Sequence, residues 1–180
     1  VCEFPEYNLH DDPTFKEKGC VKRLEDTDGD GVYDKATLFA DNVPAPTAVA
    51  CWQGGVFVGS VPDILYLKDT TGDGKADVRS VVFTGFERDK AGEGMLNSFR
   101  WGLDNRFHLS TSSAGGLVRT TLKGDAKDPV NVRSRFMLFD PRQRSFETVS
   151  AHGQHGMSMD DWGNAFVCDN SNPIHSIVYD

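Results

Sequence analysis

The chain has 180 residues, with 27 acidic and 19 basic side chains and a formal net charge of −8. This acidic balance argues against nucleic acid as a general partner, because no basic stripe is available to neutralise phosphates. Hydrophobic residues make up only 38% of the chain and glycines number 18, which favours short strands and many turns over a helical bundle. We find no apolar run as long as a membrane helix and expect no membrane segment in this chain.

Residues 1–20 are polar and contain proline, and we expect them to form an irregular N-terminal segment. The start, Val-Cys-Glu-Phe-Pro, has no initiator Met and is not a signal peptide, which indicates a mature form or an excised segment. None of the four cysteines forms a Cys-x-x-Cys pair, so neither a zinc ribbon nor a c-type haem attachment is expected here. Cys2 and Cys20 could pair in an oxidising compartment, whereas Cys51 and Cys168 are expected to be buried, inert thiols.

Two acidic turns repeat 43 positions apart, each between short apolar segments. Residues 26–34 read Asp-Thr-Asp-Gly-Asp-Gly-Val-Tyr-Asp, and residues 69–77 read Asp-Thr-Thr-Gly-Asp-Gly-Lys-Ala-Asp. A period of about 40–45 residues is typical of one blade of a β-propeller. The repeat therefore predicts both a shared turn structure and a propeller architecture.

Both turns have a spacing that suits calcium. Carboxylates at alternate positions of a tight turn point inward, and Ca²⁺ takes six to eight oxygen ligands. The predicted metal ligands are Asp26, Asp28, Asp30, the carbonyl of Val32, and Asp34 in the first turn, and Asp69, Thr71, Asp73, the carbonyl of Lys75, and Asp77 in the second. Thr37 stands where an EF-hand would have its closing Glu, so the first turn is not an EF-hand. The alternative is that both are hairpin turns that favour Asp and Gly for backbone reasons alone.

Strand-forming segments flank these turns. We expect one hairpin from residues 21–24 and 35–40 around the first turn, and another from 64–67 and 81–83 around the second. Between the two hairpins, the apolar segments on either side of a Gln-Gly-Gly turn form two more strands. The segment 86–95, rich in glycine and charge, is expected to be a loop.

The second half of the chain continues in the same way. A turn followed by a strand recurs at 53–58, 104–109 and 162–167, and a later hairpin joins 135–140 to 144–149. No convincing amphipathic helix is present. We therefore predict an all-β fold in which residues 21–180 form about four consecutive four-stranded blades of a β-propeller, as a single domain. Since an isolated piece would leave open strand edges, we expect it to be part of a larger propeller.

Four residues are candidates for chemistry. His152 and His155 flank a Gly-Gln pair in a loop before a predicted strand, and they are the best candidates for a catalytic base. The alternative is that both are hydrogen-bonded loop histidines. Arg100 and Trp101 precede a tight turn, where Arg100 could pair with a cofactor carboxylate and Trp101 could stack on a planar ring. We favour the alternative, in which Trp101 is blade core and Arg100 pairs with an acid of the next blade.

Three further residues are expected to be structural. His108 lies in a predicted strand and is expected to be packed there or to lie at its edge. Trp52 and Trp162 hold similar places in their blades, and we expect both to pack between blades.

The residues from Leu24 to Phe86 resemble a known family. They include Leu-Glu-Asp-Thr-Asp-Gly-Asp-Gly, Pro-Thr-Ala-Val, Gly-Gly-Val-Phe-Val and Pro-Asp-Ile-Leu-Tyr-Leu-Lys-Asp-Thr-Thr-Gly-Asp-Gly-Lys-Ala-Asp. Residues 94–102 and 153–163 read Gly-Met-Leu-Asn-Ser-Phe-Arg-Trp-Gly and Gly-Gln-His-Gly-Met-Ser-Met-Asp-Asp-Trp-Gly. Together these segments resemble the N-terminal propeller of the planctomycete-type membrane-bound dehydrogenase proteins. That propeller is in turn similar to the sugar dehydrogenases of the glucose and sorbosone type, which use pyrroloquinoline quinone (PQQ).

The resemblance implies a six-bladed propeller with an active site at the mouth of its central channel. There, PQQ would abstract a hydride from a sugar C–H with the help of a His base, and calcium would serve both cofactor and fold. This chain has Gly94-Met95-Leu96-Asn97 where the sugar dehydrogenases place that His. Larger relatives also carry a C-terminal c-type haem domain, so haem c would reside on a separate domain or partner. The setting of the family implies the periplasm or the cell surface.

Two functions follow from these observations. The first is the propeller of a PQQ-like sugar or alcohol dehydrogenase that passes electrons to a c-type haem partner or domain. The second is a non-catalytic, calcium-stabilised propeller that binds a glycan or a protein partner. A cluster of Arg, Trp and His at the channel mouth would favour the first function. A shallow polar face without convergent titratable groups would favour the second.

Overall fold

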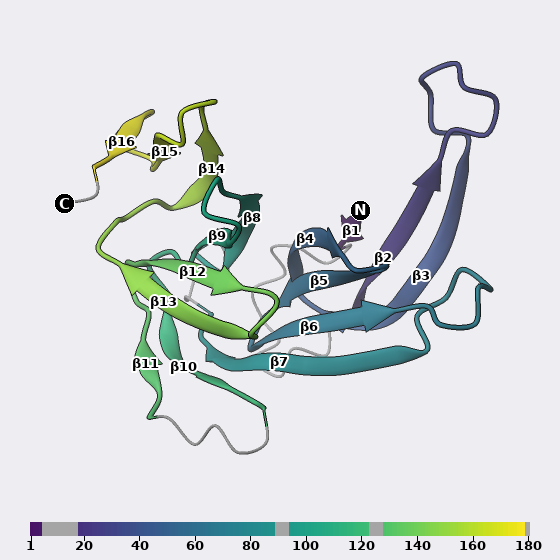
Figure 1. The fold of residues 1–180 in the computed structure, drawn as a ribbon, viewed down its shortest axis with the longest axis horizontal. Coiled ribbons are helices and arrows are strands. Elements are labelled where there is room, and N and C mark those ends of the chain that lie inside the picture. Colours follow the sequence, from purple (N-terminus) through teal and green to yellow (C-terminus); the bar gives the residue numbers. More distant parts are fainter. Residues whose placement is uncertain (5–17, 89–93, 123–127, 179–180) are drawn as a thin grey trace.

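The computed structural model describes residues 1–4, 18–88, 94–122 and 128–178, and within these ranges it contains strands, turns and loops but no helix (Figure 1). The strands form four antiparallel sheets, and none of these sheets closes on itself. The all-β prediction is therefore confirmed for the described residues. These ranges contain no helix that is long and apolar enough to cross a membrane.

Sixteen strands make up the four sheets of the described chain. The first sheet has the order β1-β2-β3, with β1 (Cys2–Glu3), β2 (Lys18–Glu25) and β3 (Lys35–Pro44). The second sheet has the order β11-β10-β7-β6-β5-β4, with β4 (Pro46–Trp52), β5 (Gly55–Ser60), β6 (Asp63–Lys68), β7 (Val78–Phe86), β10 (Gly116–Thr120) and β11 (Val130–Asn131). The third sheet has the order β13-β12-β9-β8, with β8 (Asn97–Trp101), β9 (Phe107–Ser110), β12 (Phe136–Asp140) and β13 (Ser145–Val149). The fourth sheet has the order β14-β15-β16, with β14 (His155–Met159), β15 (Ala165–Cys168) and β16 (His175–Ile177).

The predicted hairpins are confirmed. Strands β2 and β3 pair from Glu25 and Lys35 at the first acidic turn, and β6 and β7 pair from Lys68 and Val78 at the second. Strands β12 and β13 form the later hairpin. Strand β7 begins three residues earlier than the apolar pattern indicated, because the polar residues before Val81 still pair with β6.

The N-terminal segment is more ordered at its ends than the sequence indicated. Within residues 1–20, β1 pairs with β2, and the Val1 amino group and carbonyl both bond to Lys22. Residues 5–17 of this segment lie outside the described residues, as do residues 89–93 of the predicted loop 86–95. Backbone pairing therefore orders the start of the chain although its side chains are mostly polar.

The expectation of two buried thiols is wrong. Cys51 is exposed on the edge strand β4, and Cys168 is half-buried on β15, where its thiol donates to the His155 carbonyl. Cys2 and Cys20 are both free: the Cys2 thiol points to the Ala48 carbonyl and the Cys20 thiol to the Glu3 carboxylate. Burial raises the pKa of Cys2 to about 11, so this thiol is protonated at neutral pH.

The hairpin β10–β11 departs from the predicted order of consecutive four-stranded sheets. After β9 the chain leaves the third sheet, adds β10 and β11 to the β7 edge of the second sheet, and then returns as β12. Glycines permit the close approach of β10 to β7, because a Cβ on Gly85 would lie 2.1 Å from the Leu117 carbonyl oxygen. A Cβ on Gly116 would likewise lie 2.1 Å from the Gly85 carbonyl oxygen.

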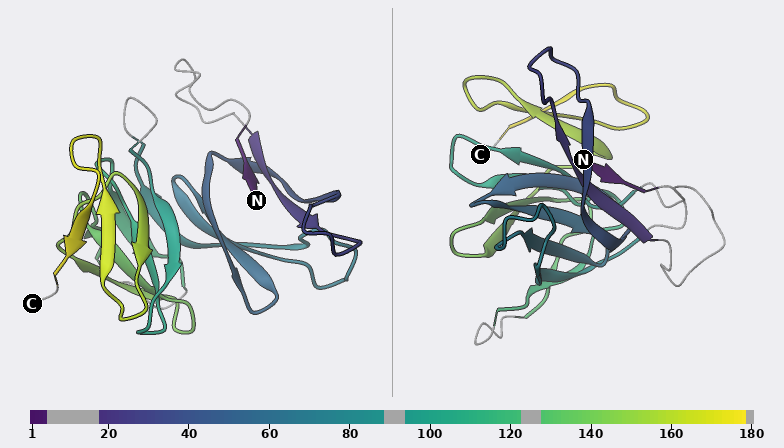
Figure 2. Two further views of the ribbon diagram at one scale, coloured as in Figure 1. Left: turned by 90° about the horizontal axis from the view of Figure 1, so that it is seen from above. Right: turned by 90° about the vertical axis from the view of Figure 1, so that its right-hand side faces the viewer.

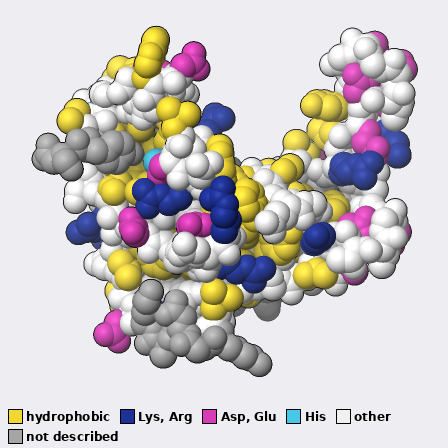
Figure 3. Space-filling view, viewed as in Figure 1, with side chains coloured by type: hydrophobic (Ala, Val, Ile, Leu, Met, Phe, Trp, Pro, Cys, Tyr) yellow, Lys and Arg dark blue, Asp and Glu magenta, His cyan; other side chains and the backbone are white. Residues whose placement is uncertain are grey.

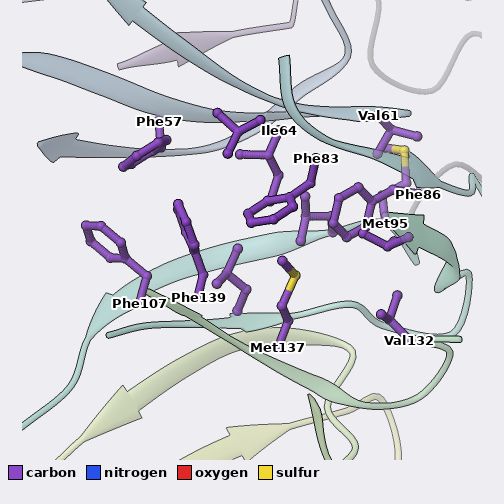
Figure 4. Packing of buried hydrophobic residues seen from close by; sticks show 14 of the residues in the cluster. Phe57, Val61, Ile64, Phe83, Phe86, Met95, Phe107, Val132, Met137 and Phe139 are labelled. Carbon is purple, nitrogen blue, oxygen red and sulfur yellow. The ribbon is translucent and has the colours of Figure 1, made fainter. Parts of the chain in front are cut away.

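The main hydrophobic core lies between the second and third sheets. Phenylalanine rings from both sheets meet there edge to face (Figure 4). Phe139 on β12 lies 4.8 Å from Phe57 and 5.0 Å from Phe83 between ring centroids. Two smaller clusters fill the space between the first and second sheets and between the third and fourth. Each sheet therefore buries a face against the next one along the chain.

The first strands of successive sheets lie close together. Strand β8 packs against β4 on one side and β14 on the other. The Thr47 hydroxyl on β4 donates to the Leu96 carbonyl just before β8, over 2.5 Å, and the Asn97 side-chain amide on β8 donates to the Gln154 carbonyl just before β14, over 2.9 Å. Figure 2 shows the third and fourth sheets side by side. Side-chain hydrogen bonds thus tie together strands that share no sheet.

Removing the central ring of this core tests the packing. Phe139 is fully buried, so Phe139→Ala should lower the free energy of unfolding by about 3–5 kcal/mol in denaturant titrations. Leu117→Ala, at a residue that is 59% exposed, should change it by no more than about 0.5 kcal/mol. Equal effects of the two substitutions would contradict a core centred on Phe139.

Candidate functional site

The first acidic turn forms the tip of the β2–β3 hairpin and is held by its own carboxylates. The amides of Gly29 and Gly31 donate to the two oxygens of Asp26, over 2.7 and 2.9 Å. The amide and hydroxyl of Thr27 donate to Asp34 across the base of the tip, over 3.2 and 2.6 Å. Gly31 has φ +91°, a backbone conformation that few other residues adopt without strain.

The second acidic turn forms the tip of the β6–β7 hairpin and repeats this geometry. The amides of Gly72 and Gly74 donate to the two oxygens of Asp69, over 2.7 and 2.8 Å. The amide and hydroxyl of Thr70 donate to Asp77 at the base, the amide over 2.6 Å. The residues that match between the two turns therefore make the same contacts, which explains why the sequence repeats them.

The two hairpins lie against one another. The Ala76 amide beside the second tip donates to the Phe39 carbonyl on β3 over 2.7 Å. The Arg79 guanidinium on β7 donates to the carbonyls of Asp41 and Asn42 on β3, over 2.5 and 3.1 Å. Both tips project from the same side of the molecule (Figure 1). These bonds fix the β2–β3 hairpin relative to the second sheet.

Only the first tip gathers three carboxylates among the described residues. Oxygens of Asp26, Asp28 and Asp30 lie within 4.8 Å of one another. Two oxygens that each lie 2.3–2.6 Å from one calcium ion can be up to about 5 Å apart, so this trio fits a Ca²⁺ ion. In the second tip, Thr71 stands at the middle position and its hydroxyl donates to Asp69 over 3.3 Å. The second tip therefore fits the metal less well than the first.

The other predicted calcium ligands make hydrogen bonds within the two turns. The carboxylates of Asp34 and Asp77 bind Thr27 and Thr70 and brace the base of each tip. The amides of Val32 and Lys75 donate to Asp30 and Asp73, over 2.8 and 2.9 Å, which closes the turn behind each carboxylate. Within the described chain, the trio of Asp26, Asp28 and Asp30 is thus the part of the first tip whose carboxylates could share one metal ion.

Hydrogen bonds hold several tip carboxylates in the ionised form. Backbone amides, that of Gly31 first, lower the pKa of Asp26 below its ordinary value, and the Gly72 amide does the same for Asp69. The hydroxyls of Thr27 and Thr70 lower the pKa of Asp34 and Asp77 in the same way. Each tip is therefore a preformed, anionic loop at neutral pH.

The four predicted catalytic and cofactor-binding residues do not meet in one site. His155 is exposed at the start of β14 and lines a pocket of about 300 Å³ with Thr47 and Asn97. His152 is exposed in the segment before β14. Arg100 donates through Nε to the Met157 carbonyl on β14, over 2.9 Å, and so links the third sheet to the fourth.

Trp101 lies at the other end of β8 from this pocket. Four residues of extended strand, roughly 13 Å, separate it from Asn97. Its ring stacks on Trp52 at 5.4 Å, and the Arg142 guanidinium lies within 5.8 Å of both indoles. The expected packing of Trp52 between sheets is confirmed, whereas Trp162 is 83% exposed and the packing expected for it is wrong.

A partly exposed network of polar and charged side chains beside β9 was not predicted from the sequence. His108 is packed, as expected, but its Nε2 lies 3.0 Å from the Asp104 carboxylate. Arg106 donates to Asp104 and to Glu147, over 2.8 and 2.9 Å. Partial burial raises the pKa of Asp104, but the bonds from His108 and Arg106 outweigh it, and the pKa lies below its ordinary value. The signal available in the sequence was the i, i+4 spacing of Asp104 and His108.

A groove of about 720 Å³ lies between the first sheet and the β4 edge of the second. Its lining is mostly apolar and comes from the N-terminus, from β2, β3, β4 and the start of β5, from the turn between β4 and β5, and from the two hairpin tips. The space-filling view shows a hollow between the β2–β3 hairpin and the rest of the molecule, with hydrophobic side chains on its floor (Figure 3). The residues that line the groove include Leu24, Tyr33, Phe39, Val49, Trp52 and Val56. Hydrophobic and aromatic walls of this size are typical of binding sites.

The chain matches a known family model. The family model described as "Domain of unknown function (DUF7133)" matches residues 1–180. No curated protein matches the chain.

The lowered pKa values predict how the tips respond to acid. When the pKa of a carboxylate is lower in the folded protein than in the unfolded chain, the carboxylate contributes stability at pH values above the unfolded pKa, near 3.9. This contribution is lost as the pH falls through the folded pKa. The amide proton shifts of Gly29, Gly31, Gly72 and Gly74 should therefore titrate with midpoints below about 3.9. NMR titration from pH 6 to pH 2.5 measures these midpoints, and values at or above the ordinary one would contradict the bonding.

Removing the aspartate acceptor of one tip should destabilise that tip and leave the other tip unchanged. Asp69→Ala deletes the acceptor of the Gly72 and Gly74 amides, so their hydrogen exchange should quicken roughly tenfold. Gly29 and Gly31 serve as the internal control, because their acceptor is Asp26. Unchanged exchange at Gly72 would show that the Asp69 bonds do not hold the turn.

Proposed function

The chain belongs to the DUF7133 family, and we propose that it is a calcium-stabilised, propeller-type binding module for a glycan or a protein partner. The observation that carries this proposal is the open apolar groove between the first and second sheets. One wall of the groove is the β2–β3 hairpin, whose tip holds the carboxylate trio. A metal at that tip would therefore stabilise the wall of the binding surface.

The arrangement of the sheets supports the propeller part of the proposal. In a propeller, blades of four antiparallel strands pack face to face, with their first strands around a central channel. Here β4–β7 form a four-strand meander, and β8, β9, β12 and β13 form a four-stranded sheet. The first strands β4, β8 and β14 lie next to one another in that order. The sheets β1–β3 and β14–β16 would be parts of the flanking blades.

The spread of the candidate residues supports binding over catalysis. Acid–base chemistry needs groups within hydrogen-bond reach of one substrate position. His155 and Trp101 lie at opposite ends of β8, and the Arg100 guanidinium bonds to a backbone carbonyl. The groove itself is lined by aliphatic and aromatic side chains, with Lys22, Arg23 and Asp69 as its charged members. Such a lining suits recognition of a partner surface.

The proposed calcium site would also fit an exported location. Calcium sites of extracellular modules are tuned to dissociation constants of about 10⁻⁴–10⁻³ M, which match calcium-rich compartments. An exposed trio with few protein ligands belongs at this weak end of the scale. We therefore propose that the module acts in the periplasm or at the cell surface.

A second candidate function is a PQQ-like sugar or alcohol dehydrogenase whose electrons pass to haem c on a separate domain or partner. It is favoured by the pocket of about 300 Å³ that His155 shares with Asn97 and Thr47. This pocket lies where β4, β8 and β14 begin, which in the proposed propeller would be one end of the central channel. PQQ, if bound there, would supply the redox chemistry, and His155 would be placed to accept a proton.

Calcium should stabilise the protein through the first tip. In chelator-treated protein, calcium at ten times its dissociation constant should add about 1.4 kcal/mol of stability, or roughly 3–6 °C in melting temperature. Asp28→Asn removes one carboxylate of the trio and should abolish this shift. Asp73→Asn is the matched control in the second tip and should leave the shift unchanged. An equal shift in wild type and Asp28→Asn would contradict the metal site.

The repeat also predicts a gain of function. Thr71→Asp gives the second tip the carboxylate pattern of the first, so calorimetric titration should find about one additional calcium ion per chain. The Thr71→Asn variant, which adds no charge, serves as the control. A stoichiometry that stays the same in Thr71→Asp would show that the carboxylate trio does not determine calcium binding.

Titration with PQQ separates the two functions. If the chain is a binding module, calorimetry with PQQ in millimolar calcium should give no saturable heat. Saturable binding that is lost in His155→Ala and kept in His152→Ala would instead support the dehydrogenase at the pocket beside Asn97.

A further inference from the structure

We propose that a pocket between the third and fourth sheets, beside the turns that follow β8 and β14, binds one neutral sugar ring of a glycan. The inference rests on the proposed binding function, because it selects the glycan as the partner and assigns it to a site apart from the groove. The sugar would lie against Trp162 and form hydrogen bonds with Asp104 and Arg106.

The pocket has a volume of about 310 Å³ and two unlike walls. The polar wall consists of Asp104, Arg106 and His108, and the apolar wall of Leu138, Met159 and Trp162. His108 on β9 pairs with Leu138 on β12, so the two residues share the face of the third sheet that meets the fourth. The volume is near the lower limit of small-molecule sites, which suits a ligand of one ring.

Hydrogen bonds inside the third sheet hold the polar wall in place. The Asp104 carboxylate accepts a bond from Arg106 Nε over 2.8 Å and lies 3.0 Å from His108 Nε2. Gly102 leaves room for this pair, because a Cβ there would lie 2.5 Å from His108 Nε2. The side chains of Asp104 and Arg106 nevertheless remain 34% and 28% exposed. Both are therefore oriented in advance and still within reach of a ligand.

His108 adds an unsatisfied polar atom to this wall. The residue is only 6% exposed, and its Nδ1 is buried without a hydrogen-bond partner among the described residues. Buried polar side-chain atoms are normally hydrogen-bonded, so this exception calls for a partner. A hydroxyl group both donates and accepts, and could therefore bond to Nδ1 in either tautomer of the ring.

The charges in the pocket are already paired, which favours a neutral ligand. Arg106 donates to Asp104 and, through Nη1, to Glu147 over 2.9 Å. An anionic ligand would compete with these carboxylates for Arg106, and a cationic ligand would compete with Arg106 for Asp104. The second terminal nitrogen of Arg106, Nη2, takes no part in these bonds. Together with the carboxylate of Asp104 it offers a donor and an acceptor to the hydroxyls of a sugar.

Trp162 belongs to the β14–β15 turn, which its own hydrogen bonds fix. The Asp160 carboxylate accepts from the amides of Trp162 and Asn164, over 3.0 and 2.8 Å. The turn touches the preceding one, since a Cβ on Gly163 would lie 3.2 Å from Leu103 Cδ1. Leu103 is 70% exposed although the fourth sheet packs beside it, so side chains of these turns stay accessible between neighbouring sheets.

The two walls match the two kinds of surface on a sugar ring. The C–H groups of a pyranose form an apolar face that packs on an aromatic ring, and its hydroxyls point outward from the ring edge. Trp162 is 83% exposed and supplies the aromatic surface. Asp104 and Arg106 supply the few placed polar groups that orient a ligand in an otherwise apolar site.

NMR with simple glycosides tests the proposal. The probes are the methyl glycosides of glucose, galactose, mannose and N-acetylglucosamine, added to the whole isotope-labelled chain. At least one should shift the Trp162 indole N–H and the Gly163 amide saturably, with a dissociation constant below about 10 mM. Cyclohexanol, which has a ring and one hydroxyl, should bind at least tenfold more weakly. No saturable shift with any of the four glycosides would overturn the proposal.

Variants of Trp162 locate the apolar contact. Trp162→Ala should weaken glycoside binding at least tenfold, with the Gly163 amide as reporter, whereas Trp162→Phe should stay within about threefold of wild type. Ile174→Ala is the matched control, because Ile174 is 67% exposed in the segment before β16 and does not line the pocket. Circular dichroism checks that the variants are folded. Equal binding by a folded Trp162→Ala variant would contradict the site.

Arg106 separates a built pocket from simple stacking on an exposed indole. Arg106→Met keeps the length of the side chain but removes its donors, and it should weaken binding at least tenfold. Glu147→Gln removes one ion pair of Arg106 without changing the pocket lining, and it should bind within about twofold of wild type. Unchanged binding in Arg106→Met would show that the sugar only stacks on Trp162, which would overturn the pocket.

The glycoside titration and the calcium titration can fail independently. The pocket shares no residue with the calcium tips or the groove. Loss of glycoside binding with calcium stabilisation intact would overturn this site alone. Glycoside binding without calcium stabilisation would keep the sugar pocket and remove the metal from the proposed function.

Discussion

Burial of one sheet face against the next is the constraint on which the rest of this structure depends. A single antiparallel sheet leaves an apolar face in water, and stacking the sheets in sequence removes that face. The interlocked rings of Phe57, Phe83 and Phe139 show how the largest interface is filled. Because each interface joins neighbours along the chain, the positions of the first strands, the hairpin tips and the groove all follow from this stacking.

The hairpin tips add a second, local level of order. Each tip uses an aspartate as an acceptor for two glycine amides, so its fold does not require burial. At the middle position of the turn, the first tip has Asp28 and the second has Thr71. The metal site that we propose would therefore depend on this position, because the backbone geometry is set by other residues of the turn.

The groove lies where the contact between the first and second sheets ends. The second and third sheets share the largest buried cluster, whereas Val49 and Val56 of the second sheet are only partly buried beside the first sheet. This partly covered surface is mostly apolar. It is therefore the surface on which we base the proposed binding function.

The sequence by itself determined the all-β class, the two repeated tips and the hairpins that carry them. These features are local: Asp26 and Gly31, like Asp69 and Gly74, make their contacts within one turn, so a short pattern specifies them. Only the tertiary structure decided the rest. It paired β10 with β7, where Gly85 and Gly116 allow the close approach, and it separated His155 from Trp101. It also left Cys51 and Trp162 exposed and formed the groove between the first and second sheets. These outcomes depend on which sheet edges and faces meet, and residues far apart in the chain set that choice, which no local pattern encodes.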